Sequence, residues 1–139
     1  WLTKNIIEKV AETLSMSFIR VMEVASFYSM FNLEPVGKNF IQICRTTPCW
    51  LRGSDKLLEV AKNVTGCNLG ETSKDDKFTL VEVECLGACC NAPMIQINDD
   101  YYEDLTEENF KHLLLKLKEN EKISTGSQTG RQSSEPKRK

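Results

Sequence analysis

One stretch decides the fold of this chain: Phe78-Thr-Leu-Val-Glu-Val-Glu-Cys-Leu-Gly-Ala-Cys89. Its first seven residues are rich in β-branched side chains and predict a strand, which a cysteine follows at once. Earlier in the chain, Phe40-Ile-Gln-Ile-Cys44 alternates as another strand and also ends in a cysteine. A helix that begins at Gly53 and Ser54 and ends at Gly66 separates the two strands. The three segments predict a right-handed βαβ unit, whose parallel strands deliver their cysteines to one edge of a sheet.

Two further helices precede this unit and place it in an α+β fold, an α/β sandwich. The segment from Ile6 to Leu14 carries apolar residues on one face, and Ser17 is the expected N-cap of a helix from Phe18 to about Phe31. That second helix is apolar around much of its circumference. It must therefore pack either within a helical bundle or against another subunit.

The C-terminal third of the chain adds a hairpin, a helix and a tail. Met94–Ile97 and Tyr101–Tyr102 predict the arms of the hairpin, and Thr106 is the expected cap of the helix. From Ser124 the chain is polar and lacks periodicity, which predicts a flexible tail rather than a folded element. The predicted organisation is a helical bundle at 1–36, a sandwich domain at 37–122 and a flexible polar tail at 123–139.

Composition narrows the class of protein. With 40% hydrophobic and 27% charged residues, the chain can bury the core of one compact domain with a small annex. Its net charge is −2 and the part before Ser124 is more acidic than the tail, which argues against a nucleic-acid partner. No apolar run approaches the ~20 residues that cross a bilayer, so we expect no membrane insertion. Six cysteines are too sparse for a disulfide-dense secreted domain, so we expect reduced thiols that bind metal or do redox chemistry.

Two cysteine pairs at the strand ends form the candidate metal site: Cys44, Cys49, Cys85 and Cys89. Four thiolates at one site bind either a tetrahedral zinc or an iron-sulfur cluster. The spacings of four and three residues are wider than the tight knuckle common for zinc, and they favour a binuclear 2Fe-2S cluster. Gly87 and Ala88 are small enough for backbone N–H groups to approach its sulfides, and Pro48 and Pro93 stiffen the two loops.

The remaining chemistry-bearing residues predict no second site. Cys67 is expected to be a small, half-buried and inert residue, whereas Cys90 could compete with Cys89 as the fourth ligand. The one histidine, His112, is expected at the surface of the last helix. The chain lacks the Cys-x2-Cys of a thiol-disulfide exchange enzyme, a nucleophile with its base, and a glycine-rich phosphate loop. We therefore expect no catalytic residues, and no flavin or nicotinamide nucleotide bound by this chain alone.

Four motifs together are similar to one family: Val24-Ala-Ser-Phe-Tyr-Ser-Met-Phe31, Pro35-Val-Gly-Lys38, Cys44-Arg-Thr-Thr-Pro-Cys49 and Glu84-Cys-Leu-Gly-Ala-Cys-Cys-Asn-Ala-Pro93. The chain resembles the E subunit of NADH:quinone oxidoreductase, respiratory complex I, from Trp1 to the tail's Thr129-Gly-Arg-Gln-Ser-Ser-Glu-Pro136. The resemblance implies a thioredoxin-like 2Fe-2S ferredoxin domain preceded by a small helical bundle. It also implies one 2Fe-2S cluster, ligated by Cys44, Cys49, Cys85 and Cys89.

The resemblance implies a role and partners as well. The chain would be an electron-carrier subunit of the NADH dehydrogenase, with no active site of its own. Its partners would be the flavin-binding subunit, which binds FMN and oxidises NADH, and neighbouring iron-sulfur subunits. Its place would be peripheral, on the cytoplasmic face of the bacterial inner membrane or the matrix side of the mitochondrial inner membrane. The equivalent subunit of an NAD-linked hydrogenase or formate dehydrogenase stays open, as do a zinc-stabilised protein-binding module and a thiol-disulfide enzyme.

Charged residues near the site are expected to tune the reduction potential of the cluster. Glu82, Glu84 and the acids of Asn98-Asp-Asp100 favour the low plant-ferredoxin range, ~−400 mV. Arg45, beside a candidate ligand, either raises the potential or points outward as a solvated side chain.

Overall fold

The computed structural model describes residues 1–134, and the chain divides into two compact units, Trp1–Val36 and Gly37 onward. The first unit contains the helices α1 (Lys4–Thr13) and α2 (Phe18–Phe27). Both helices occur where the apolar periodicity predicts them, with Thr3 and Ser17 in the N-cap positions. However, α2 ends at Phe27 rather than near Phe31. Phe27 is 79% exposed, and its ring contacts that of Tyr28 edge to face, with the ring centroids 5.0 Å apart.

The helices α1 and α2 pack on each other but leave much of their apolar surface uncovered. Ile7, Ala11 and Ala25 are buried, whereas Ile19, Phe27 and other large apolar side chains are exposed. An apolar groove of about 270 Å³ runs between the two helices within this unit. The two helices therefore form an intramolecular bundle, but the bundle does not cover all of their apolar surface.

The second unit is built on a six-stranded mixed sheet with the strand order β2-β3-β1-β4-β5-β6. The strands are β1 (Asn39–Cys44), β2 (Glu71–Thr72), β3 (Phe78–Val83), β4 (Ile95–Ile97), β5 (Asp100–Glu103) and β6 (Gly126–Ser127). The helices are α3 (Thr47–Leu51), α4 (Ser54–Thr65) and α5 (Glu107–Lys118), and a short 3-10 turn, η1, spans Cys89–Asn91. As predicted, β1 and β3 are parallel neighbours and β4 pairs antiparallel with β5.

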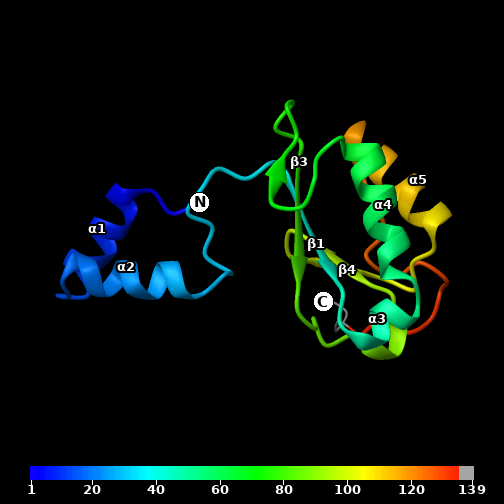
Figure 1. The fold of residues 1–139 in the computed structure, drawn as a ribbon, viewed down its shortest axis with the longest axis horizontal. Coiled ribbons are helices and arrows are strands. Elements are labelled where there is room, and N and C mark those ends of the chain that lie inside the picture. The colour runs from blue at the N-terminus through cyan, green and yellow to red at the C-terminus, as the bar shows by residue number, and fades with distance from the viewer. Residues whose placement is uncertain (135–139) are drawn as a thin grey trace. The chain divides into compact units, whose positions relative to one another are not determined.

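The core lies between the sheet and two helices. Figure 1 shows α4 and α5 side by side on one face of the sheet, which makes the α/β sandwich that the pattern predicted. Ile41, Leu57 and Phe110, from β1, α4 and α5, are each at most 1% exposed at this interface. None of the helices formed by residues 1–134 is long and apolar enough to cross a bilayer.

Local signals set the ends of these helices as expected. Gly66 ends α4 in the left-handed region, at φ 72°, where a glycine is favoured. Thr106 caps α5: its hydroxyl accepts from the Asn109 N–H, and the Asn109 side chain accepts from the Thr106 N–H. At the entrance to β1, Gly37 lies so close to β3 that a Cβ atom would come within 2.8 Å of the Phe78 backbone.

Three elements differ from the sequence-based expectation. The short helix α3 begins within the loop between Cys44 and Cys49, with Pro48 in its first turn. The polar stretch from Cys67 to Lys77 is typical of a loop, but it contains the strand β2. The expectation that no folded element follows Ser124 is wrong at Gly126–Ser127, because β6 pairs in parallel with β5. The last part of the predicted tail, 135–139, lies outside the described residues.

Candidate metal centre

The parallel pair β1 and β3 places both cysteine loops at one edge of the sheet. Cys44, the last residue of β1, pairs in register with Val83, the last residue of β3. Cys49 follows on α3, and Cys85 lies two residues beyond β3. Cys89 begins the 3-10 turn that closes the second loop. The βαβ unit therefore delivers the four thiols as predicted.

The sulfurs of the two loops contact one another. Cys85 Sγ lies 3.3 Å from Cys89 Sγ, and Cys44 shares hydrogen bonds with both Cys49 and Cys85. All six cysteines are free thiols. The structure thus brings together the four cysteines that the sequence singled out. The two pairs differ in environment, because Cys44 and Cys49 are buried whereas Cys85 and Cys89 are exposed.

Burial and hydrogen bonds shift the pKa values of the four thiols in different directions. Burial raises the pKa of Cys49 to about 12, although a hydrogen bond from the Met94 backbone opposes it. Burial also disfavours the Cys44 thiolate, but hydrogen bonds from the side chain and backbone of Thr46 outweigh it and lower the pKa of Cys44. At Cys85 the backbone N–H of Gly87 is the main cause of a lowered pKa. The pKa of Cys89 is raised, first because of its hydrogen bond with Cys85.

The donor set fits a binuclear iron-sulfur cluster. Backbone N–H groups of Thr46, Leu86, Gly87 and Met94 point at the sulfurs. Such N–H groups stabilise the negative charge of thiolates and of a bound cluster. Within residues 1–134, no three His, Cys, Asp or Glu side chains are arranged to hold a single metal ion. Four cysteine thiolates are, however, the ligand set of a 2Fe-2S cluster.

Several residues that support the site were not apparent from the sequence. Thr46 contacts the sulfur of Cys44 through its hydroxyl, at 3.4 Å, and also hydrogen-bonds Cys85. Tyr101, on β5, donates its phenolic hydrogen to the Leu86 carbonyl at 2.7 Å and so anchors the second cysteine loop. The only available signal was the spacing of Thr46 two residues after a ligand candidate.

Arg45 forms two ion pairs, so it is neither an uncompensated charge nor a solvated side chain. Its guanidinium donates to Glu82, at 2.9 Å, and to Asp55, and the side chain is 28% exposed. Burial opposes its charged form, but the hydrogen bond to Asp55 and the charge of Glu82 raise the pKa of Arg45. The positive charge expected beside Cys44 is therefore largely compensated by two carboxylates.

The other singled-out residues lie apart from these sulfur contacts. Cys67 is buried in the main core and contacts Thr65, 3.0 Å away, so it is more deeply buried than the half-buried position expected. Cys90 is exposed, with its sulfur 3.5 Å from the Ser134 hydroxyl. His112 is exposed on α5, as predicted.

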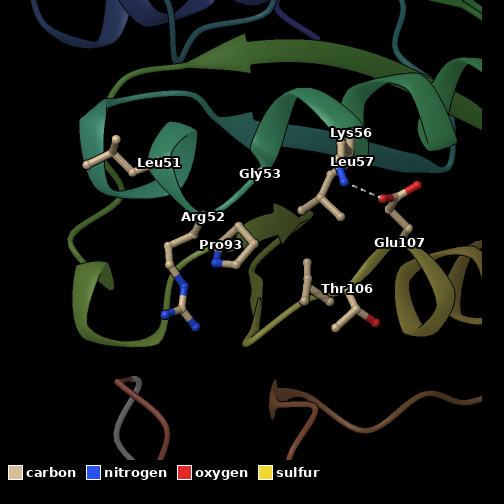
Figure 2. A pocket seen from close by; sticks show the side chains of 9 residues that line it. Leu51, Arg52, Gly53, Lys56, Leu57, Pro93, Thr106 and Glu107 are labelled. Atoms are coloured by element: carbon tan, nitrogen blue, oxygen red, sulfur yellow. Dashed lines mark ion pairs between the residues drawn. The ribbon is translucent and has the colours of Figure 1, made fainter.

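A separate pocket of about 520 Å³ opens between the first turns of α4 and α5 (Figure 2). Lys56 and Glu107 form an ion pair of 3.2 Å across it, and Pro93 and Leu105 form part of its wall. None of the four candidate ligands lines this pocket, so it is distinct from the candidate metal centre.

Comparisons with known proteins agree with this geometry. The family model of the thioredoxin-like 2Fe-2S ferredoxins matches residues 1–118. The E subunit of the NADH-quinone oxidoreductase of Rickettsia bellii is 58% identical over 118 residues, which are 85% of this chain and 71% of that protein. The mitochondrial NADH dehydrogenase (ubiquinone) flavoprotein 2 of Dictyostelium discoideum is 50% identical over 135 residues, 97% of this chain and 55% of that protein.

A solved structure shares the fold. An NAD+-reducing NiFe hydrogenase in its air-oxidized state matches with a TM-score of 0.76 at 18% identity. The match covers 84% of this chain but only 20% of the hydrogenase chain. At this identity the likeness concerns the fold alone.

Proposed function

Because the chain belongs to the thioredoxin-like 2Fe-2S ferredoxin family, we propose that it is the electron-carrying subunit of the NADH-oxidising module of a respiratory NADH:quinone oxidoreductase. The single 2Fe-2S cluster of this family supplies one-electron transfer without making or breaking bonds in the protein. The observation that carries the proposal is the meeting of two cysteine pairs at the ends of β1 and β3.

The proposed ligands of the cluster are Cys44, Cys49, Cys85 and Cys89. Three features support this set: the sulfurs contact one another, no disulfide consumes them, and backbone N–H groups point at them. Cys90 is a poorer fourth ligand, because its sulfur lies beside Ser134 whereas that of Cys89 lies beside Cys85. Cys67 is in the main core, away from this cluster of thiols.

The proposed partner is a flavin-binding subunit that binds FMN and oxidises NADH, with further iron-sulfur subunits nearby. The names of the relatives in Rickettsia and Dictyostelium support it. Two exposed apolar regions suit a subunit interface: Phe27 and Met30 on the first unit, and Trp50 and Leu51 beside Cys49. We place the chain peripherally, on the cytoplasmic face of a bacterial inner membrane or the matrix side of the mitochondrial one.

Alanine replacement of single cysteines in the chain loaded with iron and sulfide tests the ligand set. Cys44→Ala and Cys85→Ala should each abolish the visible absorption and the paramagnetic signal of the dithionite-reduced cluster. Cys67→Ala and Cys90→Ala are the matched controls, and they should keep two irons and two sulfides per chain. A colourless parent chain with one zinc would refute the iron-sulfur assignment, and loss of colour in Cys67→Ala would refute the ligand set.

The partner proposal is tested with the purified flavin-binding subunit from the same source. Phe27→Ser should weaken association measured by analytical ultracentrifugation, because it removes a side chain that is 79% exposed on α2. Lys9→Ser, on α1 in the same unit, is the control, because Lys9 is an exposed polar side chain that pairs with Glu12 on its own helix. Equal affinities for the two variants would exclude this apolar surface as the interface.

A further inference from the structure

We propose that the segment Gly126–Ser134, called the strap below, positions the ligand Cys89 by gripping the turn that follows it. The strap thereby controls how firmly the chain retains its cluster. This inference rests on the ligand set proposed above. It assigns a role near the metal to a segment whose sequence has no periodicity.

The strap holds the turn at Asn91. This side chain is 2% exposed, and its amide nitrogen donates to Glu103 Oε2 at 2.5 Å and to the Gln132 carbonyl at 2.8 Å. The Asn91 carbonyl accepts from the Asp104 N–H at 2.8 Å. Asn91 is therefore held by hydrogen bonds to the strap on one side and to the end of β5 on the other. Because it lies only two residues after Cys89, its position constrains that ligand.

Glu103 ties the strap to Asn91 through a buried carboxylate. It is fully buried, and it accepts from the Ser134 N–H at 3.0 and 3.1 Å and from the Ser134 hydroxyl at 3.3 Å. Among residues 1–134, no lysine or arginine pairs with it. Its side-chain donors are thus Asn91 and the strap. Without the strap, the Glu103 carboxylate would lose its donors from Ser134 and Asn91 would lose its bond to Gln132, so the turn would be held less firmly.

A second set of contacts reaches the residue between Cys89 and Asn91. Arg131 donates to Asp104 Oδ1 at 2.6 Å and to the Cys90 carbonyl at 3.4 Å. Ser127 donates its hydroxyl hydrogen to the other oxygen of Asp104, also at 2.6 Å. The backbone of the strap adds the β6 pairing with β5 and a bond from the Gln128 N–H to the Glu103 carbonyl, at 2.9 Å. Both residues that follow Cys89 are therefore fastened by the strap.

The second cysteine loop needs this support more than the first. Cys44 and Cys49 are each 1% exposed and lie on a central strand and a helix. Cys85 and Cys89 are exposed, and the loop between them contains Gly87 in the left-handed region, at φ 88°. Ala88 is buried in one cluster with Cys44 and Cys49, but the two cysteines on either side of it are held mainly by the anchors of the loop at Leu86 and at the turn. The strap supplies the anchor at the turn.

Two variants of the loaded chain test the proposal, each with a matched control. Ending the chain after Thr125 removes the strap, and its control ends after Ser134 and keeps every described contact. Arg131→Gln breaks the contacts to Asp104 and Cys90, and its control, Arg20→Gln, breaks an exposed ion pair on α2. Arg131 is 55% exposed, so this variant should fold even if the truncated chain does not.

The measurements are iron release to a chelator, the paramagnetic spectrum of the reduced cluster, and the urea midpoint of the iron-free chain. The strap truncation should release iron about 10–100-fold faster, because loss of groups that orient metal ligands weakens metal affinity by about that factor. Arg131→Gln should also speed the release of iron, by a smaller factor, and should change the paramagnetic spectrum of the reduced cluster. Both controls should match the parent. The spectrum separates positioning from general stability, since uniform destabilisation leaves the spectrum of the folded, loaded chain unchanged.

Each possible result supports or overturns the strap proposal. If the parent loads its cluster but both variants match the controls in spectrum and iron release, the strap has no positioning role. That result overturns the strap proposal and leaves the proposed function standing. If iron release rises only in proportion to a lower urea midpoint, with an unchanged spectrum, the role is merely structural and the proposal is also overturned. A parent chain that cannot load iron and sulfide would overturn the proposed function, and the strap proposal with it.

Discussion

Cys49 in the iron-free chain should react with iodoacetamide at least about 1,000-fold more slowly at pH 8 than in the denatured chain. Alkylation requires the thiolate. With a pKa raised from 9.0 to about 12, the folded thiol is ionised in about one molecule in ten thousand at pH 8, against about one in ten for the unperturbed thiol. The side chain is also only 1% exposed, so restricted access adds to the protection.

The protection should depend on pH with a defined sign. Below pH 9 both the folded and the denatured thiols gain thiolate in parallel, so their rate ratio stays constant. Above pH 9 the denatured thiol is already ionised, whereas the folded thiol continues to ionise toward a pKa of about 12. The ratio should therefore fall to about tenfold at pH 11. A protection that increases with pH would contradict burial as its cause.

Tryptic digestion isolates this cysteine in the peptide Thr46–Arg52, which contains no other thiol. Pulse alkylation followed by mass spectrometry of that peptide gives the rate directly. Cys44→Ala should increase the reactivity, because hydrogen bonding and charge at Cys44 both contribute to the raised pKa of Cys49. Cys67→Ala, the control, should leave it unchanged. Protection below about tenfold at pH 8 would show that the α3 loop opens in the iron-free chain and would refute the reasoning.

Three further predictions concern stability and potential. Gly37→Ala should destabilise the chain by about 1–3 kcal/mol in urea unfolding, because its Cβ would lie 2.8 Å from the Phe78 backbone. In the control, Gly70→Ala, the Cβ meets no atom within 4 Å, so the loss should be only the ~1–2 kcal/mol of a residue in the left-handed region. Thr106→Ala should cost about 1 kcal/mol in the same assay through loss of the α5 cap, and Thr106→Ser should restore most of it. Arg45→Gln should lower the midpoint potential of the cluster in a redox titration, because its two carboxylate partners stay behind uncompensated. A rise in potential would show that the two carboxylates turn away from the cluster when the arginine is replaced.

The sequence by itself determined the βαβ unit and the edge at which its cysteines meet. Two strands with β-branched and alternating residues, a helix ended by Gly66, and a cysteine after each strand are local patterns. The handedness of parallel crossovers then places both strand ends together without further information. The cap at Thr106 and the apolar stripe of α5 are equally local. For these reasons the candidate ligands could be named before any coordinates were known.

Only the tertiary structure decided the environment of each ligand. Cys44 and Cys49 are buried while Cys85 and Cys89 are exposed, although each pair begins at the end of a strand. Whether a thiol is buried depends on which segments pack over it, and these lie far away in sequence. No local pattern distinguishes the two loops in this respect.

The same holds for the charges and for the end of the chain. Arg45 meets Glu82 across 37 residues, and Asn91 meets the strap across 41 residues. A polar stretch without periodicity reads as a tail, because its order comes from partners such as the buried Glu103 and not from its own propensity. Contacts between distant polar side chains leave no periodic signature, so only folding reveals which of them form.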